Sequence, residues 1–179
     1  MSNYDASNTI VAAGGDVWLA PVGTAPPDDD AAPGVGWVNV GYVSEDGVTI
    51  SPDVEVTDFY AWQGWDPIRS ELVRYTLRYS FDLLEVTAET LPLAFGGGVS
   101  DTGVYTPPGV GDTFERALLI DVVDGDRTYR WVTSRVRPVD LGEVTFGRGE
   151  MARLPVTLGV LADPDGGTPW ELRHDLAGL

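Results

Sequence analysis

The sequence predicts an all-β protein, a β-sandwich or partly open barrel with one short flanking helix and a long protruding hairpin. Apolar and polar residues alternate with a period of two in at least six segments, which is typical of strands with one buried and one solvated face. Two of these segments are adjacent within residues 48–86 and are long enough to form an oversized hairpin. Only residues 87–95 have apolar side chains at helical spacing.

The hairpin strands separate apolar from polar side chains. The apolar face is expected to carry Val48, Ile50, Val54, Val56, Val73, Tyr75, Leu77, Tyr79, Phe81 and Leu83. The polar face is expected to carry Thr49, Ser51, Asp53, Glu55, Arg74, Thr76, Arg78, Ser80 and Asp82. Across the strands we expect Arg74 and Arg78 to pair with Asp53 and Glu55. Pro52 has no backbone donor, so it predicts a bulge in the first strand.

The connection between the two hairpin strands is unusually apolar. It carries Phe59, Tyr60, Trp62, Trp65 and Ile68. A tip that faced only water would not favour so much aromatic surface, so a covering partner is expected. A two-stranded hairpin is also marginal alone, which favours stabilisation by neighbouring subunits. Aromatic rings suit both a subunit interface and a sugar-binding platform, and we favour the interface.

Before the hairpin, the chain is predicted to contain an arm, a loop and two short strands. The arm covers residues 1–15 and the first strand residues 16–21. Residues 22–36 are rich in Pro, Gly and Asp and are interpreted as an exposed flexible loop, because this composition buries little apolar surface. The second strand is expected over residues 37–43, and residues 44–47 form the turn into the hairpin.

After the hairpin, a short helix and further strands are predicted. Thr87 is expected to cap the helix, with Leu91, Ala94 and Phe95 on its apolar side and Pro92 as an unfavourable interior residue. Residues 99–112 are interpreted as a flexible surface loop. The remaining strands are expected at residues 116–123, 127–136, 141–146, 154–161 and 170–172. No internal repeat or second domain is visible, so residues 1–179 are interpreted as one domain.

The charge of the chain argues against tight binding of nucleic acid. There are 28 acidic residues against 11 cationic residues, which gives a formal net charge of -17. Every cation is Arg, and all 11 follow residue 68. Affinity for nucleic acid comes largely from cation contacts with phosphates, so this chain is expected to repel DNA.

No constellation for catalysis, cofactor binding or metal binding is evident. The chain has no Cys and one His, His174, so neither a catalytic triad nor a His/Cys metal cluster is expected. Gly147, Gly149 and Ala152 match a dinucleotide-binding pattern, but Pro155 and the β-like residues after it favour a turn between strands. Three acidic groups could ligate calcium, and loop or turn chemistry is the simpler interpretation of each. They are Asp28, Asp29 and Asp30; Asp121, Asp124 and Asp126; and Asp163 and Asp165.

Neither a membrane span nor a secretory signal is visible in the sequence. No apolar run approaches about 18 residues, the length that a spanning helix needs. The N-terminus lacks a basic segment followed by an apolar one. The chain is therefore expected to be soluble and intracellular at synthesis.

Four segments resemble the major tail tube proteins of long-tailed, siphovirus-type bacteriophages, in particular those of actinobacterial hosts. They are VWLAPVGTAPPD, WVNVGYVSEDGVTISP, AWQGWDPIRSELVRYTLRYSFDLLE and TAETLPLAFGGG. Together they cover about the first 100 residues, and the remainder resembles this family only as a run of β-strands.

The resemblance implies a structural virion protein and not an enzyme. It implies synthesis in the host cytoplasm and assembly, as stacked hexameric rings, into the tube that delivers DNA. It assigns residues 48–57 and 70–84 to a continuous inner barrel and residues 59–69 to a loop that contacts neighbouring subunits. The implied partners are other copies of the chain and the tape-measure, tail-terminator and distal tail proteins, while double-stranded DNA passes without tight binding.

Within such a tube, the polar face of the hairpin is expected to line the lumen if the apolar face packs on the sandwich. An appended immunoglobulin-like domain, found in some relatives, is not expected within these residues. Two alternatives remain open. One is an acidic β-sandwich that binds carbohydrate at a host surface, and the other is a different ring-forming tail protein, such as a tail terminator.

Overall fold

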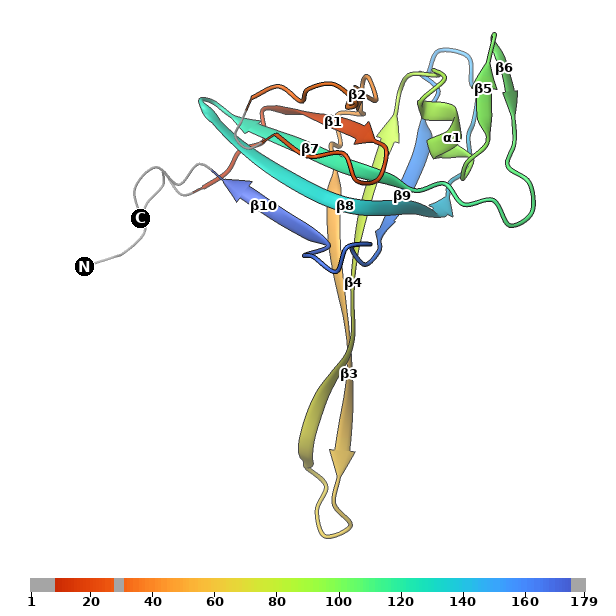
Figure 1. Ribbon diagram of the computed structural model, residues 1–179. Coiled ribbons are helices and arrows are strands. Elements are labelled where there is room, and N and C mark those ends of the chain that lie inside the picture. The colour runs from red at the N-terminus through yellow and green to blue at the C-terminus, as the bar shows by residue number, and fades with distance from the viewer. Residues whose placement is uncertain (1–8, 28–30, 175–179) are drawn as a thin grey trace.

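The computed structural model describes residues 9–27 and 31–174. Over these residues the chain forms ten strands, paired antiparallel, and one short helix (Figure 1). The strands are β1 (Gly14–Ala20), β2 (Val38–Asn39), β3 (Thr49–Tyr60), β4 (Pro67–Leu83), β5 (Val99–Asp101), β6 (Val104–Thr106), β7 (Arg116–Asp124), β8 (Arg127–Leu141), β9 (Leu154–Val160) and β10 (Trp170–His174), and the helix is α1 (Thr90–Ala94). The predicted all-β class with one short helix is confirmed.

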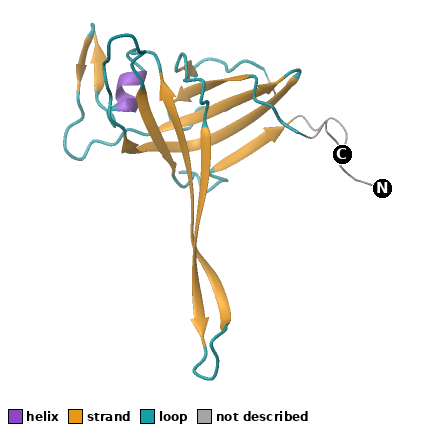
Figure 2. Ribbon diagram, turned by 180° about the vertical axis from the view of Figure 1, so that it is seen from behind, coloured by secondary structure: helices purple, strands orange, loops and turns teal. Residues whose placement is uncertain are grey.

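One sheet contains every strand of the described residues except the small β5–β6 hairpin. Its order is β2-β1-β7-β8-β9-β4-β3, and β10 pairs with β8 outside this path. The long strand β8 joins the two halves of the sheet, because its first part pairs with β7 and β10 and its last part with β9. The β3–β4 hairpin projects far from the body that the other strands form (Figures 1 and 2).

Both halves of the sheet contribute to the same hydrophobic core. Val17 of β1 and Leu83 of β4 belong to one buried cluster, although several strands separate them in the sheet. The sheet therefore curves until its halves face each other, as expected for a sandwich or partly open barrel. Tyr79 is fully buried in this core, and its hydroxyl shares a 2.8 Å hydrogen bond with Thr133. Burial raises the pKa of Tyr79 to about 12, so the side chain stays neutral at physiological pH.

Strand β7 is buried on both faces. Leu118 and Ile120 lie in the main core. The opposite face belongs to a second buried cluster of Ala20, Trp37, Ala117, Leu119 and Val132. Trp37 also fixes the preceding loop, because its indole N–H donates to the carbonyl of Ala25 at 3.1 Å. The loop before β2 thereby helps to cover the outer face of the sheet.

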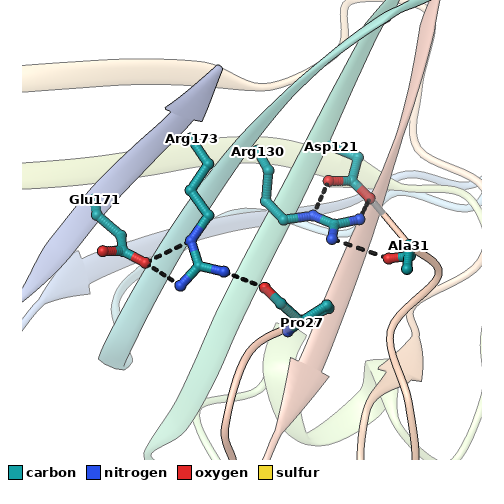
Figure 3. Close-up of polar contacts among 6 residues, drawn as sticks. All are labelled: Pro27, Ala31, Asp121, Arg130, Glu171 and Arg173. Carbon is teal, nitrogen blue, oxygen red and sulfur yellow. Dashed lines mark hydrogen bonds and ion pairs between the residues drawn. The ribbon is translucent and has the colours of Figure 1, made fainter. Parts of the chain in front are cut away.

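Arg130 of β8 forms a buried ion pair and also holds the same loop. The guanidinium of Arg130 donates to both carboxylate oxygens of Asp121, at 2.7 and 2.8 Å (Figure 3). The exposed fractions of the two side chains are 3% and 11%. Arg130 also donates to the carbonyl of Ala31 at 2.9 Å. Asp121 is therefore a strand residue held by an arginine, and its assignment to a turn or calcium loop is wrong.

A second arginine reaches the loop from β10. Arg173 donates to the carbonyl of Pro27 and, through Nε, to the carboxylate of Glu171 at 2.7 Å (Figure 3). β10 itself is the predicted last edge strand, and it extends to His174. The loop thus has two arginine contacts on its backbone carbonyls, from neighbouring strands.

The segment before the hairpin differs from its prediction. Only Val38–Asn39 of the expected strand over residues 37–43 is a strand. Gly41 has a φ of +84°, and its N–H donates to the side chain of Asn39 at 2.8 Å, so the backbone turns away from the sheet. The chain meets the sheet again at Val43, which bridges to Leu83. At the N-terminus, β1 begins inside the predicted arm, of which residues 1–8 lie outside the described residues.

Two predicted segments after the helix are also corrected. The expected loop over residues 99–112 contains the β5–β6 hairpin, whose turn uses Thr102 and Gly103 at φ values of 50° and 80°. The strand expected over residues 141–146 does not form, because β8 ends at Leu141 and the chain then runs against Pro155. A Cβ added at Gly142 would lie 2.5 Å from the Pro155 ring. The strands predicted around residues 116–136 and 154–161 are confirmed.

The helix is shorter than predicted. It begins at Thr90, with Glu89 as its N-cap, while Thr87 lies before the helix and its hydroxyl accepts the Thr90 N–H at 3.2 Å. Pro92 falls in the first turn, where its missing N–H costs no helical hydrogen bond. The helix buries Leu93 and leaves Phe95 exposed, so the predicted apolar side is only partly right.

The buried ion pair gives a direct test of this fold. Asp121→Ala leaves the Arg130 charge buried without its carboxylate, so we expect the free energy of unfolding to fall by about 3–5 kcal/mol. Denaturant unfolding measures this change. The control is Glu171→Ala, which removes a more exposed pair and should cost about 1 kcal/mol or less. Equal losses in the two variants would contradict the structural role of Asp121.

Candidate assembly surface

The hairpin divides into a base within the body and a projecting part. On its second edge β4 pairs with β9 only from Arg78 to Leu83. We call residues 53–76 the outer hairpin. Within the described residues its strands pair only with each other, so both of its edges are open. At about 3.4 Å per residue, the outer hairpin extends the chain by about 30 Å.

Two bulges on β4 shape the outer hairpin. The first lies opposite Glu55 and Val56 and leaves Val73 as an extra residue. The second lies near the tip and leaves Ile68 as an extra residue. Bulges increase the local twist, and the two strands wind around each other along their length (Figure 1).

The bulge predicted at Pro52 is not there. Pro52 pairs with Leu77 in continuous register. β3 is the last strand of the sheet, and proline is tolerated on edge strands because the missing N–H need not complete a central ladder. The proline is therefore accommodated by its edge position.

One face of the outer hairpin is apolar and uncovered. The register places Val54 opposite Tyr75 and Val56 opposite Leu72. Their exposed fractions are 51% for Val54, 48% for Tyr75, 52% for Val56 and 62% for Leu72. Within a single chain, the apolar face packs on the body only at the base of β4, and the outer hairpin leaves this face uncovered. An exposed apolar patch of this kind is typical of an interaction surface.

The tip carries the most exposed aromatic side chains of the hairpin. The loop covers residues 61–66, shorter than the predicted 59–69, because the strands extend further. Trp62 and Trp65 are 100% and 99% exposed. Phe59, Tyr60 and Ile68 belong to the strand ends and are also exposed. A single chain therefore leaves all five predicted interface residues exposed, and the two Trp side chains almost completely so.

The opposite face is polar, as the alternation predicts. The register brings together Thr49 with Ser80, Ser51 with Arg78, Asp53 with Thr76 and Glu55 with Arg74. Arg74 and Glu55 form an exposed ion pair at 3.5 Å, which confirms one of the two expected pairs. Such exposed pairs contribute about 0–1 kcal/mol. The other pair is wrong: Arg78 faces Ser51, and no Arg78–Asp53 ion pair forms among the described residues.

Arg153 supplies a charged contact at the hairpin base that sequence reasoning missed. Its guanidinium lies 2.8 Å from the Asp46 carboxylate and 3.5 Å from that of Asp82. Hydrogen bonds to these carboxylates raise the pKa of Arg153. Asp46 and Arg153 are 107 residues apart, so no local pattern signals their contact. Arg153 and Asp82 line an open pocket of about 610 Å³, whose walls also include Glu45, Glu143 and Glu150.

The other acidic groups that were considered as calcium sites and that the structure describes lie in turns. Asp163 accepts the N–H of Asp165 at 2.8 Å, and this backbone bond lowers the pKa of Asp163. Gly125, at a φ of +60°, forms the β7–β8 turn with the flanking Asp residues. No cluster of three or more potential metal ligands occurs among the described residues, and Asp28, Asp29 and Asp30 lie outside them.

The dinucleotide pattern does not precede a helix. Gly149 has a φ of +89°, and β9 begins at Leu154, so the pattern lies in a connection that leads to a strand. A dinucleotide site requires a helix N-terminus at this place. The interpretation of these residues as a turn between strands is therefore confirmed.

Within the described part of the chain, no helix has the length and apolarity required to cross a membrane. No match was found among curated protein sequences. A family model described as "Phage tail tube protein" matches residues 2–173, nearly the whole chain. This match agrees with the all-β fold described above. The chain therefore belongs to the phage tail tube protein family.

Proposed function

We propose that copies of this chain form hexameric rings that stack into the tube of a phage tail. The observation that carries the proposal is the outer hairpin, which has two open edges, one uncovered apolar face and one polar face. Open strand edges favour pairing with another chain. When the hairpins stand side by side, β3 of one copy meets β4 of the next antiparallel, and closure of the ring removes every open edge. The hexameric number rests on the resemblance to major tail tube proteins.

The two faces then have different environments. The apolar face, with Val54, Val56, Leu72 and Tyr75, lies against the bodies of neighbouring copies and loses its contact with water. The polar face lines the lumen, through Thr49, Ser51, Asp53, Glu55, Arg74, Thr76, Arg78, Ser80 and Asp82. The aromatic tip, including Phe59, Tyr60, Trp62, Trp65 and Ile68, makes contacts between copies.

The charge of this wall suits the passage of DNA. Arg74 is paired with Glu55, and Asp82 lies beside Arg153, so part of the lumen charge is neutralised locally. The chain as a whole carries a net charge of -17. Repulsion between the wall and phosphates acts over about 8 Å at physiological salt, so DNA passes without tight binding.

In this function the chain is a structural component and not an enzyme. Residues 1–179 act as one tube domain, made in the host cytoplasm and carried in the virion tail. Its partners are other copies of itself, and the tape-measure, tail-terminator and distal tail proteins. Membership in the tail tube family supports self-assembly and association with other tail proteins, and the choice of these particular partners rests on the resemblance to major tail tube proteins.

Electron microscopy of the purified protein tests the proposal. We expect rings or tubes with a central channel at concentrations where the hairpins associate. A protein that stays monomeric at all concentrations, or that binds glycans as a monomer, would favour the carbohydrate-binding alternative. Rings that never stack would favour a tail terminator.

The aromatic tip should matter for assembly and not for folding. Because Trp62 and Trp65 are fully exposed in the single chain, Trp62→Ala and Trp65→Ala should change the free energy of unfolding of the monomer by less than about 0.5 kcal/mol. Loss of a buried interface aromatic costs on the order of 2 kcal/mol, so the critical concentration for tubes should rise at least tenfold. Sedimentation measures this concentration. Phe146→Ala is the control, since that exposed aromatic lies outside the hairpin. Tip variants that assemble and resist denaturant like the wild type would contradict the interface role.

The lumen assignment predicts a salt-dependent effect on DNA passage. Asp53→Lys with Glu55→Lys leaves an attractive wall, so DNA ejection should slow, most strongly at low salt where screening is weakest. The measurement is the ejection rate from particles with intact mutant tails over a salt series. Asp126→Lys with Asp165→Lys is the matched charge control, because both residues are exposed in turns outside the hairpin and the change in charge is the same. An unchanged rate at low salt would mean that these side chains do not meet the DNA.

A further inference from the structure

An apolar pocket of about 310 Å³ lies between the end of β1 and α1. Its walls include Leu19, Pro21, Val38, Pro92 and Phe114. Both α1 and the end of β1 lie on the side of the body away from the hairpin tip (Figures 1 and 2). The pocket and the tip therefore occupy opposite ends of the molecule.

The rim of this pocket offers one acceptor and one cation. Glu89 is the N-cap of α1, but its side chain makes no cap hydrogen bond. The guanidinium of Arg116 lies 4.3 Å from the centre of the Phe114 ring, with no carboxylate among its described contacts. An occupant with an aromatic body, an N–H donor and a neighbouring carboxylate would match the walls and both rim charges.

The hairpin tip has this combination of groups. Trp65 provides an apolar indole with one N–H donor, and Asp66 follows it directly. Trp65 lies in the loop between β3 and β4 and is 99% exposed. The hairpin that ends in this loop projects away from its own body (Figure 1). The indole ring of the tip thus matches the apolar walls of the pocket, and its N–H donor and the neighbouring carboxylate match the two rim residues. The pocket that receives them belongs to another copy of the chain.

We propose that the pocket receives the tip of a second copy, with Trp65 inside it, Glu89 accepting the indole N–H and Asp66 facing Arg116. The inference rests on the proposed function, and it identifies the pocket that binds the hairpin tip. A contact between opposite ends is heterologous: two joined copies together leave one tip and one pocket unused, so every further copy adds in the same orientation. This arrangement gives the stack of rings its polarity.

Cross-linking in assembled tubes tests the contact, because the chain contains no Cys. Gly64→Cys places a thiol in the tip, at a position with no other atom within 4 Å of the added Cβ. Ala88→Cys places one at the pocket. When copies with one change are mixed with copies carrying the other, a short bismaleimide should give covalent dimers in tubes but not in dilute monomers. In the control mixture, Asp126→Cys replaces Ala88→Cys. Residue 126 follows the end of β7, whereas Arg116 at the pocket begins that strand, so residue 126 is far from the pocket.

The outcomes separate this inference from the function on which it rests. Tubes with tip-to-pocket dimers well above the control support it. Tubes in which the tip links no better to residue 88 than to residue 126 overturn it and leave the tube function intact. If the wild-type chain forms no tubes, both proposals fail together.

A second variant keeps the test independent of cross-linking chemistry. Ala88 is exposed at the pocket, so Ala88→Trp should fill the pocket without disturbing the fold. We expect an unchanged circular dichroism spectrum and at least a tenfold higher critical concentration for tubes. Asp126→Trp should assemble like the wild type. Wild-type assembly by a folded Ala88→Trp variant would overturn the inference.

Discussion

The pairing of β3 with β4 is the interaction on which the rest of the structure depends. β4 ends as a core strand, with Leu77, Tyr79, Phe81 and Leu83 buried, and this part anchors the hairpin in the body. The same ladder continues past the last contact with β9, so strand pairing alone carries the outer hairpin away from the core. A two-stranded ladder has little stability by itself. The buried base therefore supplies the rigidity that the projecting part lacks.

The outer hairpin keeps its two-faced character across the first bulge without a core to impose it. Val56 still meets an apolar partner, Leu72, and Thr57 meets the polar Glu71. The alternation ends nearer the tip, where Asp58 pairs with Ser70 on the face of Val56. Exposed apolar surface of this kind is costly in water, and a repeating assembly offers every copy the same cover.

Much of this architecture could be predicted from local patterns, because alternation reports which strands have two different faces. The hairpin, the strands around residues 116–136 and the turn at Gly125 follow from period-two patterns and turn residues. Interactions between distant residues could not be predicted in the same way. The contacts of Arg130 with Ala31 and of Arg153 with Asp46 depend on sheet curvature and loop path, which no local window contains.

The errors at the candidate surface have the same origin. Alternation identified the apolar face of the outer hairpin, but it could not tell whether the body or another molecule covers that face. It also placed Val73 with Tyr75, whereas the bulge leaves Val73 as an extra residue between paired positions. The prediction of a strand over residues 37–43 was wrong because Asn39 and Gly41 form a local turn that competes with strand pairing.

Hydrogen exchange measured on free chains and on assembled tubes tests the central claim most directly. The claim is that the outer hairpin is open in the single chain and covered in the assembly. Amides of residues 53–60 and 68–76 that point away from the β3–β4 ladder should exchange rapidly in the free chain and become protected in tubes. Core amides of β7 should be protected in both states. Equal exchange of the outer hairpin in both states would contradict the account.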